Sequence, residues 1–199
     1  MLGPMAIVIR PFTVDLWPAL EDLFARGGDG DAHWCWCMYW RWRAKDFSSS
    51  TVAANRAALR DLAGRDPAAG LVALDGEQAV GWCSVGPRAD YGRLEHSRTI
   101  PRVDDQPAWS IVCLVVRRTR RGQGVARALI DAAVAHAAAH GAPVIEGYPA
   151  VVPDDERIPG NLAYAGTTRL FAAAGFRVVA PTAARTAGTP RVVVRRELP

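Results

Sequence analysis

The chain has 199 residues, of which 50% are hydrophobic and 22% are charged, and its formal net charge is +4. This composition excludes a largely disordered or collagen-like chain, and the length suits a single domain over residues 1–199. No apolar run approaches the roughly 20 residues that cross a bilayer, and four scattered cysteines do not form a disulfide scaffold. We therefore expect a cytoplasmic protein with free thiols and no membrane association.

Hydrophobic periodicity and turn residues define the elements of the first half of the chain. The segment 33–43 stands out because it holds four of the seven tryptophans and two of the four cysteines. The Asp75-Gly76 pair between two apolar runs is typical of a tight β-hairpin. The predicted elements are a strand at 6–12, a helix from Thr13 to Phe24, a helix at 51–63, and hairpin strands at 71–74 and 78–85.

In the second half, strands and helices alternate, which predicts βαβ units in an α/β fold. A polar segment with three prolines, residues 87–107, reads as a long loop. A nearly continuous apolar run then predicts a central strand that is covered on both faces. The predicted elements are a strand at 109–116, an alanine-rich helix ending near His140, a strand at 144–148, a helix at 162–174, and strands at 176–180 and 191–196 around a loose loop at 181–190.

The strongest motif is Arg121-Gly122-Gln123-Gly124-Val125-Ala126, which lies between the central strand and the alanine-rich helix. Glycines let backbone N–H groups approach an anion, and a helix start adds its positive dipole end. Arg117, Arg118, Arg120 and Arg127 surround the motif with positive charge. A tight turn is the simplest alternative. A P-loop would need a Gly-Lys-Ser/Thr ending, and a Rossmann fingerprint would need a third glycine or alanine where Arg127 stands.

Two segments together resemble the GCN5-related N-acetyltransferases. The segment 116–126 resembles their pyrophosphate motif Arg/Gln-x-x-Gly-x-Gly/Ala, and Leu170 to Phe176 resembles their Tyr-x-x-x-Gly-Phe motif at a helix end. The resemblance implies a mixed α/β sheet that is flanked by helices and splits between strands 109–116 and 144–148. Acetyl-CoA would lie in the split. The implied cofactor-binding residues are Leu114, Val115, Val116, Arg121, Gly122, Gln123, Gly124, Val125, Ala126, Arg127 and Phe171.

The same resemblance implies direct attack of an amine on the thioester, which requires a base, a polarised carbonyl and often an acid for the thiolate. Phe171 stands where relatives carry a proton-donating tyrosine. Tyr164 lies seven residues earlier on the same predicted helix. For the base we predict Glu146, a carboxylate inside an apolar strand, with Tyr148 on the same face. The alternative is a solvent-facing residue or a salt bridge to an arginine.

The resemblance also implies that the segment after the first helix borders the acceptor site. Trp34, Trp36, Tyr39 and Trp40 are therefore predicted to bind the acceptor, although tryptophans at short spacing also pack as core. The alternation of His33, Cys35 and Cys37 lacks the paired spacing of a zinc site, so we predict no metal.

The sequence thus predicts an enzyme that moves an acetyl group from acetyl-CoA to a primary amine of a small molecule. Three alternatives remain open: a peptide or protein N-terminal acetyltransferase, a non-catalytic acyl-CoA-binding protein, and a basic nucleic-acid-binding surface. The glycine motif accounts for the arginines without nucleic acid. The expected partners are acetyl-CoA and a small amine, with no nucleic acid and no membrane, and a homodimer is left open.

Overall fold

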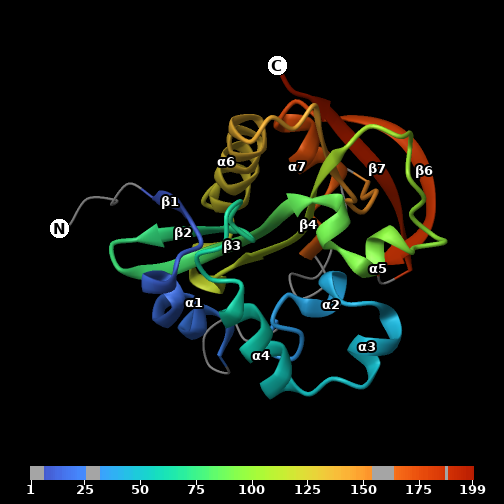
Figure 1. The fold of residues 1–199 in the computed structure, drawn as a ribbon. Helices are drawn as coiled ribbons and strands as arrows, with labels where there is room; N and C mark the ends of the chain where they lie inside the picture. Colours follow the sequence, from blue (N-terminus) through green and yellow to red (C-terminus); the bar gives the residue numbers. More distant parts are fainter. Residues whose placement is uncertain (1–6, 26–31, 154–163, 187) are drawn as a thin grey trace.

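The computed structural model describes residues 7–25, 32–153, 164–186 and 188–199. A mixed sheet of seven strands in the order β1-β2-β3-β4-β5-β7-β6 forms the centre (Figure 1). Only the β4–β5 pair is parallel among the pairs formed by these strands. The strands are β1 (Val8–Pro11), β2 (Leu71–Asp75), β3 (Gln78–Pro87), β4 (Ala108–Val116), β5 (Val144–Gly147), β6 (Arg177–Thr186) and β7 (Thr189–Glu197).

Helices cover both faces of the sheet, which gives two separate apolar cores. Helices α6 and α7 lie on one face, and α1, α2, α3 and α4 lie on the other (Figure 1). The α-helices are α1 (Trp17–Phe24), α2 (Met38–Arg41), α3 (Ala44–Ser48), α4 (Val52–Asp61), α5 (Gly92–Glu95), α6 (Val125–Ala139) and α7 (Thr168–Ala173). Short 3-10 turns lie at Val14–Leu16, Arg88–Asp90 and Arg118–Arg120. None of the helices in the described ranges is long and apolar enough to cross a membrane.

The central strands part at a defined residue. β4 pairs with β5 only from Ala108 to Ile111, and the register ends at the Ile111–Gly147 pair. β4 nevertheless continues to Val116, so its last five residues keep a free edge on the β5 side. This is the split that the sequence predicted between these two strands.

A β-bulge marks the same point on the other side of β4. Ser84 of β3 pairs with Cys113 and Val85 pairs with Ile111, so Val112 is the extra residue. A bulge turns two successive side chains toward one face. Val112 and Cys113 accordingly both belong to the core on the α1 side, whereas Ile111 and Leu114 belong to the α6 side.

The predicted hairpin at 71–85, the central strand and the alanine-rich helix are confirmed. Of the helix predicted at 162–174, residues 162–163 lie outside the described ranges, and the prediction is wrong over residues 164–167. Residues 164–165 form a 3-10 turn, Gly166 has φ +71°, and α7 begins only after Thr167, whose side chain accepts a hydrogen bond from the Leu170 amide. The positive φ at Gly166 interrupts the helical path.

The predicted loose loop at 181–190 is also wrong. β6 and β7 extend through it as one long hairpin with Gly188 (φ +81°) in its turn. Register shifts in β6 between Val178 and Ala180 and between Pro181 and Arg185 explain why the sequence shows no clean alternation there. In the predicted loop at 87–107, the structure adds a 3-10 turn and the short helix α5.

Candidate active site

The glycine motif forms an open cradle at the start of α6. Gly122 and Gly124 have φ of +75° and +81°, and a Cβ placed on either would meet no atom within 4 Å. Gly124 is the N-cap of α6 and makes no side-chain cap, so the first amides of this 15-residue helix point outward without a capping group. The residues present therefore fit a pyrophosphate, because the site combines open space, exposed amides and a positive helix end.

The arginines around this cradle are largely neutralised. Arg117 pairs with Asp22, Arg120 with Asp75, and Arg127 with Asp131. Arg121 donates to the Val116 carbonyl at 3.1 Å and forms no ion pair with a described residue. The charge of Arg121 is therefore not compensated by a carboxylate of the described residues, and its hydrogen bond connects the glycine motif to the end of β4.

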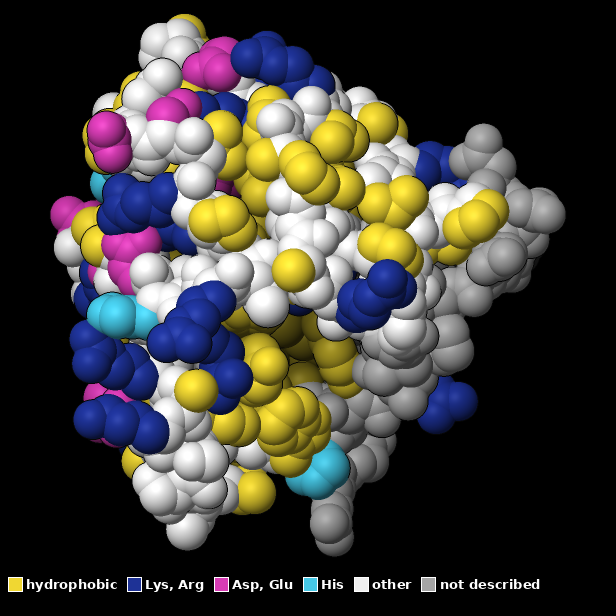
Figure 2. All heavy atoms as spheres, turned by 90° about the vertical axis from the view of Figure 1, so that its right-hand side faces the viewer, with side chains coloured by type: hydrophobic (Ala, Val, Ile, Leu, Met, Phe, Trp, Pro, Cys, Tyr) yellow, Lys and Arg dark blue, Asp and Glu magenta, His cyan; other side chains and the backbone are white. Residues whose placement is uncertain are grey.

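A mostly apolar cavity of about 490 Å³ lies beside the bulge of β4. We call it the thiol cavity because three cysteines line it. Its wall comprises Trp34, Cys35, Cys37, Val112, Cys113 and Tyr164, together with Tyr39, Trp40, Arg185 and Arg191. Figure 2 shows a hollow with hydrophobic side chains inside and Lys and Arg side chains at its rim.

The aromatic segment divides between this cavity and the core. Trp34, Tyr39 and Trp40 line the cavity, as the predicted acceptor role requires. Trp36 does not line this cavity. It is buried and stacks between Trp17 (ring centroids 5.9 Å apart) and Phe24 (5.4 Å), so its packing is that of a core residue.

The backbone at Trp36 and Cys37 is left-handed, with φ of +45° and +58°. This region costs a residue with a side chain about 1–2 kcal/mol, so neighbouring contacts must maintain it. The stacked Trp36 ring is one such contact. The second is a hydrogen bond of 3.0 Å from the Trp82 indole nitrogen to the Cys37 sulfur. The strained turn thus holds the Cys37 thiol in a fixed place on the cavity wall.

The surroundings of Cys37 favour its thiolate. A hydrogen bond from the Cys113 thiol is the main cause that lowers the pKa of Cys37, with Trp82 and the Arg41 charge adding to it against the effect of burial. Cys35 lines the same cavity and differs, because burial and the neighbouring Cys37 raise its pKa to about 12. The pKa values of these two cysteines, two residues apart, are therefore shifted in opposite directions.

Glu146 and Tyr148 lie in a polar network on the paired part of β4 and β5. Glu146 is 1% exposed, and it accepts hydrogen bonds from Arg195 (2.7 Å), Tyr148 (2.9 Å) and Arg88 (3.4 Å). Tyr148 also bonds Ser110 at 2.8 Å, and burial raises the pKa of its phenol. Neither residue lines the thiol cavity. The position of Glu146 matches the salt-bridge alternative in the sequence analysis.

Phe171 is fully buried, where its ring lies between two glycines. A Cβ on Gly147 would lie 2.3 Å from the ring and one on Gly166 would lie 2.9 Å from it, so both positions must be small. Tyr164 does not share a helix with Phe171. It lies in the turn before Gly166 and lines the thiol cavity.

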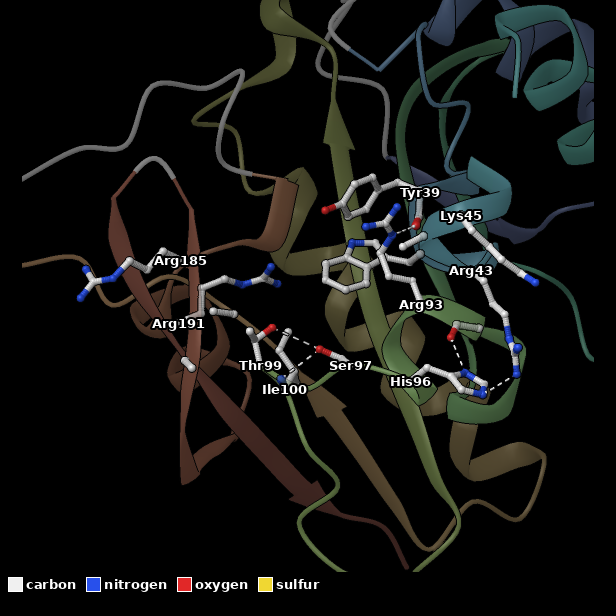
Figure 3. A pocket seen from close by; sticks show the side chains of 15 residues that line it. Tyr39, Arg43, Lys45, Arg93, His96, Ser97, Thr99, Ile100, Arg185 and Arg191 are labelled. Atoms are coloured by element: carbon white, nitrogen blue, oxygen red, sulfur yellow. Dashed lines mark hydrogen bonds between the residues drawn. The ribbon is translucent and has the colours of Figure 1, made fainter. Parts of the chain in front are cut away.

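A second cavity of about 640 Å³ adjoins the first and shares four of its residues: Tyr39, Trp40, Arg185 and Arg191. We call it the arginine cavity. It is lined by five cations and by no Asp or Glu of the described residues. The cations are Arg43, Lys45, Arg93, Arg185 and Arg191, and His96 lies among them (Figure 3).

Sequence reasoning missed Cys37, Cys113, Arg93 and Arg191. A signal existed for Arg191, because it shares a strand face with Val193 and Arg195 at a spacing of two, and Val193 is buried. An arginine on the apolar face of a strand needs a polar partner or a ligand. The described residues contain no group of three or more His, Cys, Asp and Glu side chains that could hold a metal ion.

A split mixed sheet with an amide cradle at the mouth of the split defines an acyl-CoA-binding fold. The model of the Acetyltransferase (GNAT) family matches residues 33–157. The match covers more than half of the chain, so the protein belongs to the GNAT acetyltransferase family and is an acetyl-CoA-dependent transferase. No curated protein matches the sequence.

Solved structures share the fold at low sequence identity. A Drosophila melanogaster polyamine N-acetyltransferase, which forms N-acetylagmatine, is 14% identical over 97% of this chain and 100% of its own (TM-score 0.59). The NatC complex bound to Gag peptide and CoA is 15% identical over 98% and 100% (TM-score 0.57). A ribosomal-protein-alanine N-acetyltransferase from Brucella melitensis is 18% identical over 96% and 99% (TM-score 0.56). These similarities concern the fold alone.

Proposed function

We propose that the enzyme transfers the acetyl group of acetyl-CoA directly to a primary amine of a small molecule. The main support for this proposal is that three features coincide at one point of β4. There β5 departs after Ile111, Val112 forms a bulge, and Val112 and Cys113 line the thiol cavity. A donor held along the free edge from Leu114 to Val116, with its pyrophosphate on the α6 cradle, would place its thioester at this cavity. The cavity volumes are those of small-molecule sites.

In the proposed reaction the amine nitrogen attacks the thioester carbon, the new C–N bond forms and the C–S bond breaks. The extra residue of a bulge leaves its backbone groups outside the strand ladder. Val112 has no register partner on β3, and we propose that its amide polarises the thioester carbonyl as negative charge develops on the carbonyl oxygen.

We assign the acceptor's ammonium proton to the Cys37 thiolate and not to Glu146. Cys37 lines the cavity and its pKa is lowered, whereas Glu146 lies outside the cavity and accepts from two arginines and a tyrosine. A base must lie within hydrogen-bond reach of the proton that it takes.

Tyr164 is the proposed donor of a proton to the departing CoA thiolate. It lines the thiol cavity, and Phe171 has no proton to give. The nitrogen of the adduct gives its second proton to the Tyr164 phenolate, and the Cys37 thiol releases its proton to solvent. The cycle therefore balances with the acetylated amine, free CoA and one proton as products.

The test is a screen of small amines, amino acids and peptides with acetyl-CoA, in which released thiol is measured. Turnover of small amines with kcat/KM well above that of peptides supports the proposal. Higher kcat/KM for peptide N-termini would establish the peptide alternative. Tight acetyl-CoA binding without turnover of any amine would establish the non-catalytic alternative.

A further inference from the structure

Many arginines in the described ranges have carboxylate partners among the described residues, and those of the arginine cavity do not. Eleven arginines form ion pairs with Asp or Glu within the described ranges: Arg10, Arg41, Arg56, Arg65, Arg88, Arg102, Arg117, Arg120, Arg127, Arg177 and Arg195. No cation that lines the arginine cavity is among them. Four arginines without a carboxylate partner among the described residues, Arg43, Arg93, Arg185 and Arg191, thus line one cavity beside the thiol cavity.

Arg191 is the key member because its charge is buried. It is 7% exposed, its Nε donates to the Tyr148 carbonyl at 2.7 Å, and its guanidinium lies 5.3 Å from the centre of the Trp40 ring. Burial without a carboxylate lowers its pKa to about 10. A buried cation held without a counter-ion destabilises the free protein, and an anionic ligand would remove that cost.

A second cation of the arginine cavity lies against Tyr39. Arg93 is half-buried; its Nε donates to the Tyr39 carbonyl at 2.8 Å and its guanidinium lies 4.0 Å from the Tyr39 ring centre. In Figure 3, Arg191 reaches from β7 toward Tyr39, whereas Arg185 points the opposite way, and Arg185 donates to the Gly188 carbonyl. Arg191 and Arg93 are thus the two guanidinium groups on either side of the Tyr39–Trp40 pair.

We propose that the acceptor is an anionic amine, whose carboxylate or phosphate binds Arg191 and Arg93 while its amine enters the thiol cavity. This inference rests on the proposed function, since it names the substrate class of the same site. Arg191 lines both cavities, so an anion bound to it lies where the two meet. Guanidinium groups bind carboxylate and phosphate through paired N–H donors.

The same cavity argues against a polycationic acceptor. A polyamine would place ammonium groups beside five cations without a carboxylate from the described lining. Like charges in a partly buried site raise the free energy of binding. The substrate class therefore differs from that of the structurally similar polyamine N-acetyltransferase.

The test measures binding by calorimetry in the presence of CoA, with probes that differ only in the anion. Two matched pairs serve: O-phosphoethanolamine against ethanolamine, and phenylalanine against phenylalaninamide. We expect the anionic member of at least one pair to bind at least about tenfold more tightly, the lower range for a hydrogen bond to a charged group. Equal binding, or binding of neither member, in both pairs overturns the inference.

Variants locate the anion. Arg191→Gln should abolish the preference within a pair, and the half-buried Arg93→Gln should reduce it several-fold without the folding risk of a buried change. Arg177→Gln on β6, outside both cavities, is the matched control and should keep the preference. A preference that survives in folded Arg191→Gln and in Arg93→Gln places the anion elsewhere and overturns the inference.

Turnover separates this inference from the proposed function. Selective binding of the anionic amines without thiol release would sustain the binding site and refute acetyl transfer to these amines. Thiol release that favours neutral or polycationic amines would sustain acetyl transfer and refute the anionic class.

Discussion

The proposed donor side and the proposed acceptor side of the split are built in different ways. On the donor side, consecutive residues from Arg121 to Arg127 and the edge of β4 present backbone amides, and the glycines leave space. On the acceptor side, the wall combines side chains from the segment after α1, the bulge of β4, the turn at Tyr164 and the β7 strand. The donor is common to a whole family of enzymes, whereas the acceptor distinguishes one enzyme from another. Backbone amides suit the binding of a donor that all members share. Side chains from separate parts of the chain suit the recognition of an individual acceptor.

The largest expected effect concerns Glu146. We expect it to stabilise the strands between the two sides and to take no part in donor binding or in proton transfer. Glu146→Gln would leave Arg195 and Arg88 with less compensating charge in a buried site, so we expect the free energy of unfolding to fall by about 3–5 kcal/mol. Denaturant unfolding measures this loss. Glu197→Gln removes an exposed carboxylate that pairs with Arg177 and should cost under about 1 kcal/mol. Wild-type stability with a large loss of kcat would instead make Glu146 the base.

A second prediction concerns CoA binding on the donor side alone. Gly124→Asp places a carboxylate in the open space where the pyrophosphate would bind, so we expect CoA affinity to fall by about a hundredfold, or roughly 3 kcal/mol. Calorimetry measures the affinity. Gly141→Asp is the matched control, because Gly141 has φ +70° and equally open space at the other end of α6. Equal CoA affinity in the two variants would show that the cradle is not the CoA site.

A third prediction tests the acceptor side through Cys37. Its lowered pKa means that the thiolate, and with it the activity, is present above that pKa and lost as the pH falls through it. Cys37→Ser should therefore lower kcat by about a hundredfold, the lower end of what a general base contributes, and remove this acidic limb of the pH profile. The deficit should shrink at high pH, where free amine accumulates.

Cys35→Ser is the control for that measurement. Cys35 lines the same cavity, but its pKa is raised to about 12, so its thiol stays protonated across the working range. We expect a nearly unchanged pH profile. Identical profiles for both variants and the wild type would remove Cys37 from the mechanism.

The same contrast explains how much the sequence could predict. The hairpin and the glycine turn at the start of α6 follow from local patterns of strand, turn and helix, whereas the split of the sheet follows from the resemblance to a known family. The structure contains all three. The acceptor side depends on pairs such as Arg191 and Trp40, which are 151 positions apart in the sequence. They come into contact because β7 carries Arg191 to the Trp40 ring. No local pattern encodes such a contact. The same limit hid the ion pairs of Glu146, whose partners Arg88 and Arg195 come from opposite directions along the chain.

Trp36 and Cys37 show a further limit. Sequence patterning assigns side chains to faces on the assumption of regular backbone, and a left-handed pair breaks the alternation. Trp36 consequently points into the core while Cys37 and Trp34 line the cavity. The spacing of the tryptophans in the sequence could not show which of them packs in the core and which line the cavity.

Lys45 on the wall of the arginine cavity has a chemical consequence of its own. It is the only lysine in the sequence, since the other 23 basic residues are arginines. Arginine side chains do not accept acyl groups from thioesters under ordinary conditions, so Lys45 is the single side-chain amine that acetyl-CoA could modify spontaneously. The enzyme therefore offers almost no amines that compete with its acceptor. An amine-reactive fluorophore would also attach at one side chain, beside the cavity whose occupancy it would report.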